Sequence, residues 1–166
     1  MDEPNIEPAD PVSALCGRIV DRFGDATVGV VYYGAKRRDD TRQEAEGLHD
    51  LIVIVDGYRA AYDSFFLAIL NRLLPPNVFY VEATAGGATH RAKYAVVSLD
   101  QLVGHCAPRC MQTWFFGRLA QPVDIVHARS DEARTKIRAV LDQAAATLVG
   151  KAVPLFREPF TTDELW

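Results

Sequence analysis

The sequence lacks the features typical of disulfide-stabilised secreted proteins and of proteins that cross a membrane. It has three cysteines, an odd number that does not make a framework of paired disulfides. Its longest unbroken aliphatic run, residues 51–55, is far shorter than the roughly 20 apolar residues of a transmembrane helix. Its opening, MDEPNIEPAD, has neither the basic nor the apolar region of a signal peptide. We therefore expect a cytoplasmic protein that contacts a membrane at most peripherally.

The chain also has no excess of positive charge. Its 18 lysines and arginines stand against 22 aspartates and glutamates, for a net charge of −4. Without a basic field over the whole surface, indiscriminate attraction to nucleic acid is not expected. We predict no nucleic-acid partner, and we expect any polyanionic ligand to be held by a local group of cations.

The pattern of apolar residues predicts an α+β fold in which helices pack on a mixed β-sheet. Its first two strands follow one another directly, without the helix that a parallel βαβ unit requires. Ser98 and Gln101 have the spacing of a helix capping box, and Gly150 is expected to cap the last helix. The predicted elements are helices over 12–23, 62–73 and 109–119, a short one after Ser98 and one from Ser130, and strands over 27–33, 51–55, 78–82, 94–98 and 122–126.

The domain organisation predicted from composition has three parts. Residues 1–11 read as a disordered tail because they are rich in proline and acidic groups. Residues 12–150 form one domain, and 151–166 read as a linker and the start of a further domain. Thr161 and Glu164 have capping-box spacing ahead of two apolar residues, which is typical of a helix that begins there. A disordered natural tail is the alternative for this segment.

A glycine and an aspartate flank the charged segment between the first two predicted strands. If these strands pair as a hairpin, Gly34 and Asp50 meet at the same sheet edge. Gly34 lets the backbone turn so that amides face a phosphate chain, and Asp50 offers an oxygen ligand to Mg²⁺. This is the layout of polymerase-β-like nucleotidyltransferases, although ordinary turn chemistry also places these residue types there.

Four blocks of the sequence resemble the mitochondrial translocator assembly and maintenance type of phosphatidate cytidylyltransferase. That family has a Tyr-Gly-Ser-Gly block, an aspartate before an aliphatic strand, a Lys-Tyr-Gly-Val-Val segment, and a tryptophan followed by Ala-Gly-Arg-Leu and Lys-Pro-Val. The last block is the most specific because six of its residues keep both type and spacing here. The resemblance covers about residues 28–128, and the corresponding blocks are Gly34, 50–56, 93–98 and 114–123.

The resemblance implies an activity and a set of site residues. The activity is transfer of CMP from CTP to phosphatidic acid with Mg²⁺, which gives CDP-diacylglycerol and pyrophosphate at the inner face of a membrane. Asp50 would be a metal ligand, the segment Gly34, Ala35 and Lys36 would cradle phosphates, and Lys93 and Arg118 would be their cationic partners. A phosphomonoester has its second pKa near ~6, so the attacking oxygen needs no general base. Family members continue into a winged-helix-like domain, which agrees with the domain boundary predicted near the end of this chain.

Two departures from these patterns bear on activity. Ala35 stands where the family has a serine, so a hydroxyl contact to phosphate is absent, although Lys36 adds a charge beside it. Ile52 stands where many nucleotidyltransferases have a second carboxylate, and Asp56 lies about 20 Å farther along the strand than Asp50. Glu82 is the candidate for a second metal ligand, and a solvated carboxylate at the end of a strand is the alternative.

Two rival functions remain open from the sequence. One is a catalytically degenerate nucleotide-binding domain, and the other is a nucleotidyltransferase with a different acceptor. Among other motifs, His105, Cys106 and Cys110 are better explained as helix and core residues than as zinc ligands. The aromatic run 114–116 reads as core, while His90 and Arg91 either touch substrate or solvate a basic loop over residues 85–93.

Overall fold

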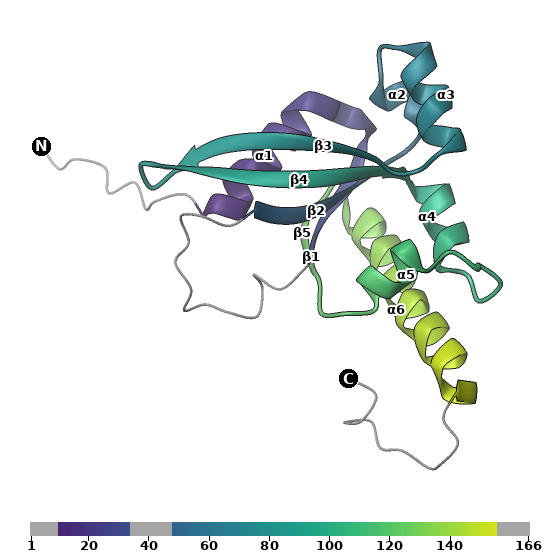
Figure 1. The fold of residues 1–166 in the computed structure, drawn as a ribbon. Helices are drawn as coiled ribbons and strands as arrows, with labels where there is room; N and C mark the ends of the chain where they lie inside the picture. The colour runs from purple at the N-terminus through teal and green to yellow at the C-terminus, as the bar shows by residue number, and fades with distance from the viewer. Residues whose placement is uncertain (1–9, 34–47, 156–166) are drawn as a thin grey trace, which may run out of the picture.

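The fold is built on a five-stranded mixed β-sheet (Figure 1). The structure, a computed structural model, describes residues 10–33 and 48–155. The strand order is β3-β4-β2-β1-β5; β2 and β4 are parallel, and the other neighbouring pairs are antiparallel. This confirms the predicted α+β class with a mixed sheet. The strands are β1 Thr27–Tyr33, β2 Leu48–Val55, β3 Asn77–Ala85, β4 Ala88–Ser98 and β5 Asp124–Ala128.

Helices cover both faces of this sheet, which explains why its central strands are continuous apolar runs. One face packs against α1 (Pro11–Phe23), with α2 (Tyr58–Ala61) and α3 (Phe65–Leu73) at the end of the sheet. The other face packs against α4 (Leu99–Cys106), α5 (Thr113–Leu119) and α6 (Asp131–Ala152). All of β1 and residues 51–55 of β2 are buried, as expected for strands covered on both sides. The short 3₁₀ segments Gly24–Ala26 and Val153–Leu155 follow α1 and α6.

Several helix ends form as the sequence predicts. Gly24 ends α1 with φ of 52°, a conformation that favours glycine. The hydroxyl of Ser98 accepts a hydrogen bond from the backbone N–H of Gln101 at 3.3 Å, and that of Ser130 accepts one from Ala133 at 3.1 Å. Gly150, however, does not cap the last helix, because α6 runs through it to Ala152. Glycine inside a helix costs about 1 kcal/mol, and the last fully buried side chain of α6, Thr147, comes before it.

The prediction of a basic loop over residues 85–93 is wrong. The β3–β4 hairpin turns at Gly86 and Gly87, whose φ angles are 56° and 77°, and β4 resumes at Ala88. A two-residue turn of this kind matches the twist of paired strands, so both strands extend almost to the tip. His90 is consequently buried within β4, where it neither lines a loop nor lies open to solvent.

The predicted helix over 62–73 is also corrected. Within that range only α3 forms, beginning at Phe65, while α2 ends before it at Ala61; α3 buries only Ala68 and Asn71. Phe65, Phe66 and Leu73, which contribute to the predicted apolar stripe, are 62%, 71% and 71% exposed. Farther along, α5 is shorter than the predicted 109–119 segment, and β5 begins two residues later than the predicted strand. In the part of the chain that the structure describes, no helix is both long and apolar enough to cross a bilayer.

Candidate functional site

Three polar side chains form a row across neighbouring strands of the sheet. Asp50 of β2 is in register with Tyr33 at the end of β1 on one side and with Lys93 of β4 on the other. Residues paired directly across a sheet project from the same face, so the three lie together on the face that α5 packs against. The prediction that Asp50 and Lys93 share a site is therefore consistent with the sheet register. Asp50 lies inside β2, not ahead of the strand as predicted.

Asp50 and Lys93 form a partly buried ion pair. Asp50 Oδ1 lies 3.1 Å from Lys93 Nζ, and the two side chains are 27% and 43% exposed. The Asp50 Oδ1 atom is itself buried, and the contact with Lys93 lacks the angular geometry of a hydrogen bond. A charged oxygen held away from water in this way retains capacity to bind a cation or a donor. The flexible four-carbon stem of Lys93 lets its ammonium move from this carboxylate to a bound anion.

Arg118 comes to the same site from α5. Its Nη1 donates a hydrogen bond to the backbone carbonyl of Trp114 at 3.2 Å, and its Cζ lies 4.4 Å from the centre of the Trp114 ring. The i, i+4 spacing on one helix brings these two residues together. This stacking contact holds the guanidinium over the ring and leaves N–H donors of its fork for another group. Phe115 and Phe116 beside it are buried in the core, as predicted for this aromatic run.

Tyr33 is a member of the site that the sequence analysis does not identify. Burial raises the pKa of its hydroxyl, and the negative charge of Asp50 raises it further, while the guanidinium of Arg118 lowers it. The opposing effects indicate that Tyr33 lies within electrostatic reach of both residues. Its position directly before Gly34 is the signal that could have found it, because the resembling family has a Tyr-Gly block at this point.

The other predicted site residues are placed differently. Gly34, Ala35 and Lys36 lie outside the described residues, next to Tyr33 in the chain. Glu82 of β3 lies across β4 from Asp50, and its Oε1 is 2.7 Å from Nε of Arg91 in an exposed ion pair. The structure thus places the predicted second metal ligand in another interaction. Asp56, which the sequence analysis places too far from Asp50 to share a metal with it, lies at the other end of β2. There it binds Arg129, whose Nη2 donates a hydrogen bond to Asp56 Oδ1 at 3.1 Å.

The residues of the row fit a magnesium ion that is shared with substrate. Mg²⁺ is commonly held by one or two carboxylates together with substrate phosphates and water. Asp50 supplies one such carboxylate, with the buried oxygen described above. Within residues 10–33 and 48–155, no group of three or more His, Cys, Asp or Glu side chains could hold a metal by itself. Among the described residues, Asp50 would therefore be the carboxylate that holds the metal, with the remaining ligands supplied from elsewhere.

His105 and Cys106 of α4 contact the core on the α5 and α6 side of the sheet. The His105 ring stacks on Phe115 with centroids 4.8 Å apart, and Cys106 is fully buried. Burial raises the pKa of Cys106 to about 12, so the thiol stays protonated at neutral pH. Cys106 packs in the core as predicted, whereas Cys110 lies beyond the end of α4 and is only partly buried.

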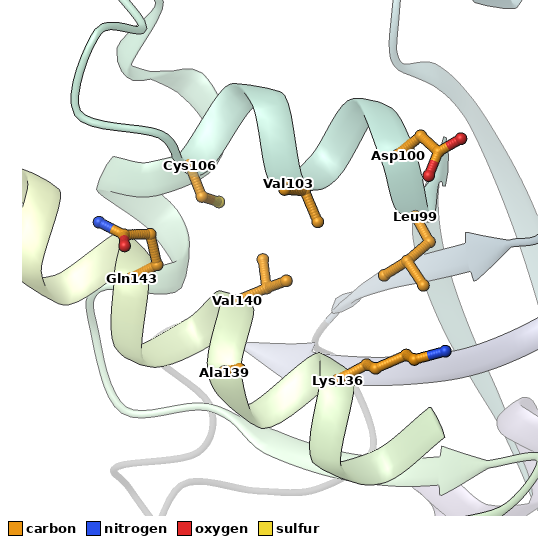
Figure 2. A pocket seen from close by; sticks show the side chains of 8 residues that line it. All are labelled: Leu99, Asp100, Val103, Cys106, Lys136, Ala139, Val140 and Gln143. Atoms are coloured by element: carbon orange, nitrogen blue, oxygen red, sulfur yellow. The ribbon is translucent and has the colours of Figure 1, made fainter. Parts of the chain in front are cut away.

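A groove between α4 and α6 lies away from this row (Figure 2). Its volume is about 490 Å³, and its floor is mainly apolar, with Leu99 and Val103 of α4 facing Val140 of α6. Asp100 and Lys136 are its charged residues. None of the predicted site residues lines this groove, so the row at Asp50 remains the candidate site.

The row of Tyr33, Asp50 and Lys93, together with Arg118 of α5, combines one carboxylate, two cations and a neutral phenol on one face of the sheet. Cations beside a carboxylate can bind a phosphate chain and a divalent metal together. A comparison of the chain with protein-family models and with curated proteins found no match.

Proposed function

We propose that this chain is a nucleotidyltransferase domain that transfers CMP from CTP to phosphatidic acid. The products are CDP-diacylglycerol and pyrophosphate. The resemblance of four sequence blocks to phosphatidate cytidylyltransferases supports the proposal. A lipid acceptor would bring the chain to a membrane surface, and for a cytoplasmic protein this is the inner face.

One observation carries the proposal most strongly: Asp50 lies in register between Tyr33 and Lys93. Tyr33 ends the strand that leads into the predicted phosphate-binding segment at Gly34. Lys93 comes from a different block of the resemblance, and only the parallel pairing of β2 with β4 brings it beside Asp50. Arg118 belongs to a third block, and the pKa of Tyr33 responds to it. Residues from separate blocks thus meet at one place.

In the reaction, a phosphate oxygen of phosphatidic acid attacks the α-phosphorus of CTP. The bond from that phosphorus to the bridging oxygen of the β-phosphate breaks, and pyrophosphate leaves with the bonding electrons. The nucleophile is already ionised at neutral pH, so no side chain has to remove a proton. The residues instead position the phosphates and neutralise their charge.

Each residue of the row, and Arg118 beside it, has a defined part in that task. Asp50 would hold Mg²⁺, which when bound stabilises charge on the transferred and leaving phosphates. Lys93 exchanges its partner Asp50 for a phosphate oxygen as the nucleotide binds. Arg118 offers a guanidinium fork already oriented by Trp114. Tyr33 is neutral at pH 7, as an ordinary tyrosine is, and burial raises its pKa further, so it can orient Arg118 without adding negative charge.

A nucleotide-binding domain without transfer activity is the second candidate. The observation that favours it is the pairing of Asp50 with Lys93, because the predicted second carboxylate, Glu82, is instead bound to Arg91. A single carboxylate can bind a metal nucleotide without organising transfer. The substitution Ala35→Ser tests whether the missing family serine weakens the site. A restored hydroxyl contact should strengthen triphosphate binding by about 1 kcal/mol, and unchanged affinity would show that Ala35 is not the equivalent of that serine.

Calorimetry with each nucleoside triphosphate and Mg²⁺ tests the proposal directly. We expect CTP to bind in a metal-dependent manner and more tightly than ATP, GTP or UTP. Incubation with CTP and phosphatidic acid then separates the two candidates by the appearance of CDP-diacylglycerol. Absent binding of all four nucleotides would remove both candidates, and equal binding would remove the preference for CTP.

The substitution Arg118→Lys tests the role of the guanidinium. It keeps the charge but loses the two-pronged donor and the flat stacking contact with Trp114. If Arg118 binds phosphate, CTP affinity should fall while the melting temperature changes little. A lower melting temperature with normal CTP affinity would show that Arg118 is structural.

A further inference from the structure

Helix α3 turns most of its large apolar side chains away from the core. Five such residues on the helix and directly after it are 40% to 71% exposed: Phe65, Phe66, Ile69, Leu73 and Leu74. The four within the helix each lie three or four residues from another, so they share one side of it. The two residues that α3 buries, Ala68 and Asn71, lie on the opposite side. We call the five exposed residues the α3 face.

The buried side of α3 fixes the helix to the rest of the fold. Asn71 Nδ2 donates a hydrogen bond to the backbone carbonyl of Val96 at 3.1 Å, and Asn71 Oδ1 accepts one from the hydroxyl of Tyr62 at 2.7 Å. On the outer side, the Arg59 guanidinium carbon lies 5.0 Å from the centre of the Phe65 ring. The α3 face is therefore presented by an anchored helix, which reduces the entropy that is lost when a partner binds.

The α3 face lies at the end of the sheet opposite the candidate site. Helices α2 and α3 follow the carboxyl end of β2, whereas Asp50 lies near the beginning of that strand. In Figure 1, both helices project from this end of the sheet, above α4 and away from α6. A partner bound on the α3 face leaves Asp50 uncovered, so an inference about this face does not depend on the proposed function.

The size of the α3 face matches one half of a protein–protein interface. An aromatic side chain carries about 150 to 250 Å² of surface, so the five exposed side chains together present on the order of 600 Å². The largest apolar patch of a typical monomer is about 300 to 600 Å². Specific interfaces begin at about 1,200 Å² in total, or about 600 Å² from each partner. Two copies of the α3 face therefore reach the area that a specific dimer needs.

The charges at the two ends of α3 make this face complementary to itself. Asp63 stands just before the helix and Arg72 in its last turn, and both are exposed. Neither forms an ion pair in the part of the chain that the structure describes. When two copies pack α3 against α3 in opposite directions, a two-fold axis places Asp63 of each copy beside Arg72 of the other. An anionic lipid surface, by contrast, would favour cations and repel Asp63.

We propose that this chain forms a two-fold symmetric dimer through the α3 face. The two α3 helices run antiparallel, with Phe66 of each copy against Ile69 of the other and an Asp63–Arg72 pair at each end. The area lies at the small end of the range for specific complexes, so we expect a dissociation constant roughly in the micromolar range. The dimer requires neither nucleotide nor metal.

Sedimentation velocity of the full chain tests the proposal. Across about 1 to 200 μM protein, which brackets a micromolar dissociation constant, the mass should rise from 18.4 kDa towards twice that value. Phe66→Asp should weaken association at least about tenfold, because it places a charge at the centre of the interface. Met111→Asp is the matched control, since Met111, between α4 and α5, is 85% exposed and lies outside the α3 face. A chain that stays monomeric throughout, or an equal loss in the control, would overturn the proposal.

Two charge reversals test the antiparallel geometry. In a dimer of either Asp63→Arg or Arg72→Asp alone, like charges meet at both ends of the interface, so association should weaken several-fold. A mixture of the two variants restores an opposite-charge pair at each end, so a mixed dimer should form with nearly the affinity of the unmodified chain. Failure of the mixture to recover association overturns the antiparallel packing.

Two further measurements keep the outcome decisive. Should Phe66→Asp lose its cooperative thermal melt, Phe66→Ser removes the same ring without adding charge and replaces it in the comparison. Co-sedimentation with phosphatidylcholine vesicles tests the other apolar surface that the α3 face could meet. A monomeric chain that binds these vesicles through Phe66 would show that a membrane covers the face in place of a second copy, and the proposal would then be wrong.

Discussion

The substitution Asp50→Asn separates a ligand-binding role of this carboxylate from a structural one. Asparagine keeps the size of the side chain and one carbonyl oxygen but removes the charge. The change therefore removes the ion pair with Lys93 and leaves the packing of β2 intact. It also removes the one carboxylate that the row offers to Mg²⁺.

The expected loss of folding stability in Asp50→Asn is small, because the ion pair that it removes is partly exposed. Lys93 is 43% exposed, so solvent screens the ion pair and its ammonium can turn to water. Ion pairs of this kind contribute about 0 to 1 kcal/mol, whereas breaking a fully buried pair costs roughly 3 to 5 kcal/mol. For a chain of this size, 1 kcal/mol corresponds to a fall of about 2 to 4 °C in melting temperature.

The expected loss of ligand binding is much larger. Metal stabilisation of phosphate charge is worth several kcal/mol, so metal-dependent CTP affinity should fall at least about a hundredfold. Calorimetry with CTP, with and without Mg²⁺, measures this change, and a thermal melt measures the stability. Asp56→Asn is the matched control because Asp56 also forms an ion pair, a more exposed one with Arg129, at the other end of β2.

The results that would refute this assignment are specific. A fall in melting temperature far beyond 4 °C with normal CTP affinity would make Asp50 a structural residue. Equal loss of CTP affinity in the Asp56 control would show that the nucleotide binds at the other end of β2, or that charge removal acts non-specifically.

Further predictions follow from the same geometry. Asp50→Asn should lower the pKa of Tyr33 and Arg118→Gln should raise it, because the two charges act in opposite directions; NMR titration of tyrosine labelled at the ring carbon measures both signs, and shifts in the same direction would contradict the site. Gly29→Ala should destabilise the fold by about 1 to 3 kcal/mol in urea titration, because the new Cβ would lie 2.9 Å from a backbone carbonyl oxygen of β5; an unchanged midpoint would contradict that packing. Cys106 should resist thiol reagents at pH 8 until the protein unfolds, since it is buried with a pKa of about 12, and rapid labelling of the native protein would contradict its burial.

Much of the local structure is predictable because it depends on near neighbours in the chain. Continuous β-branched runs predict the buried strands β1 and β2, and the side-chain caps at Ser98 and Ser130 mark the beginnings of α4 and α6. The prediction fails at Gly86 and Gly87, where two glycines read as a loop although they form the tight turn of a long hairpin. It also fails at α3, whose apolar residues repeat with helical spacing but remain largely exposed, since periodicity alone does not show what covers a face.

The candidate site divides in the same way. The sequence by itself determined which residues could carry the chemistry, because Asp50, Lys93 and Arg118 stand in blocks whose residue types suit a phosphate and a metal. Only the tertiary structure decided which of them meet: the parallel pairing of β2 with β4 places Lys93 beside Asp50, whereas the β3–β4 hairpin commits Glu82 to Arg91. Strand pairing and register depend on contacts over the whole sheet and both helical layers. The spacing of residues within one segment of the sequence therefore does not predict them.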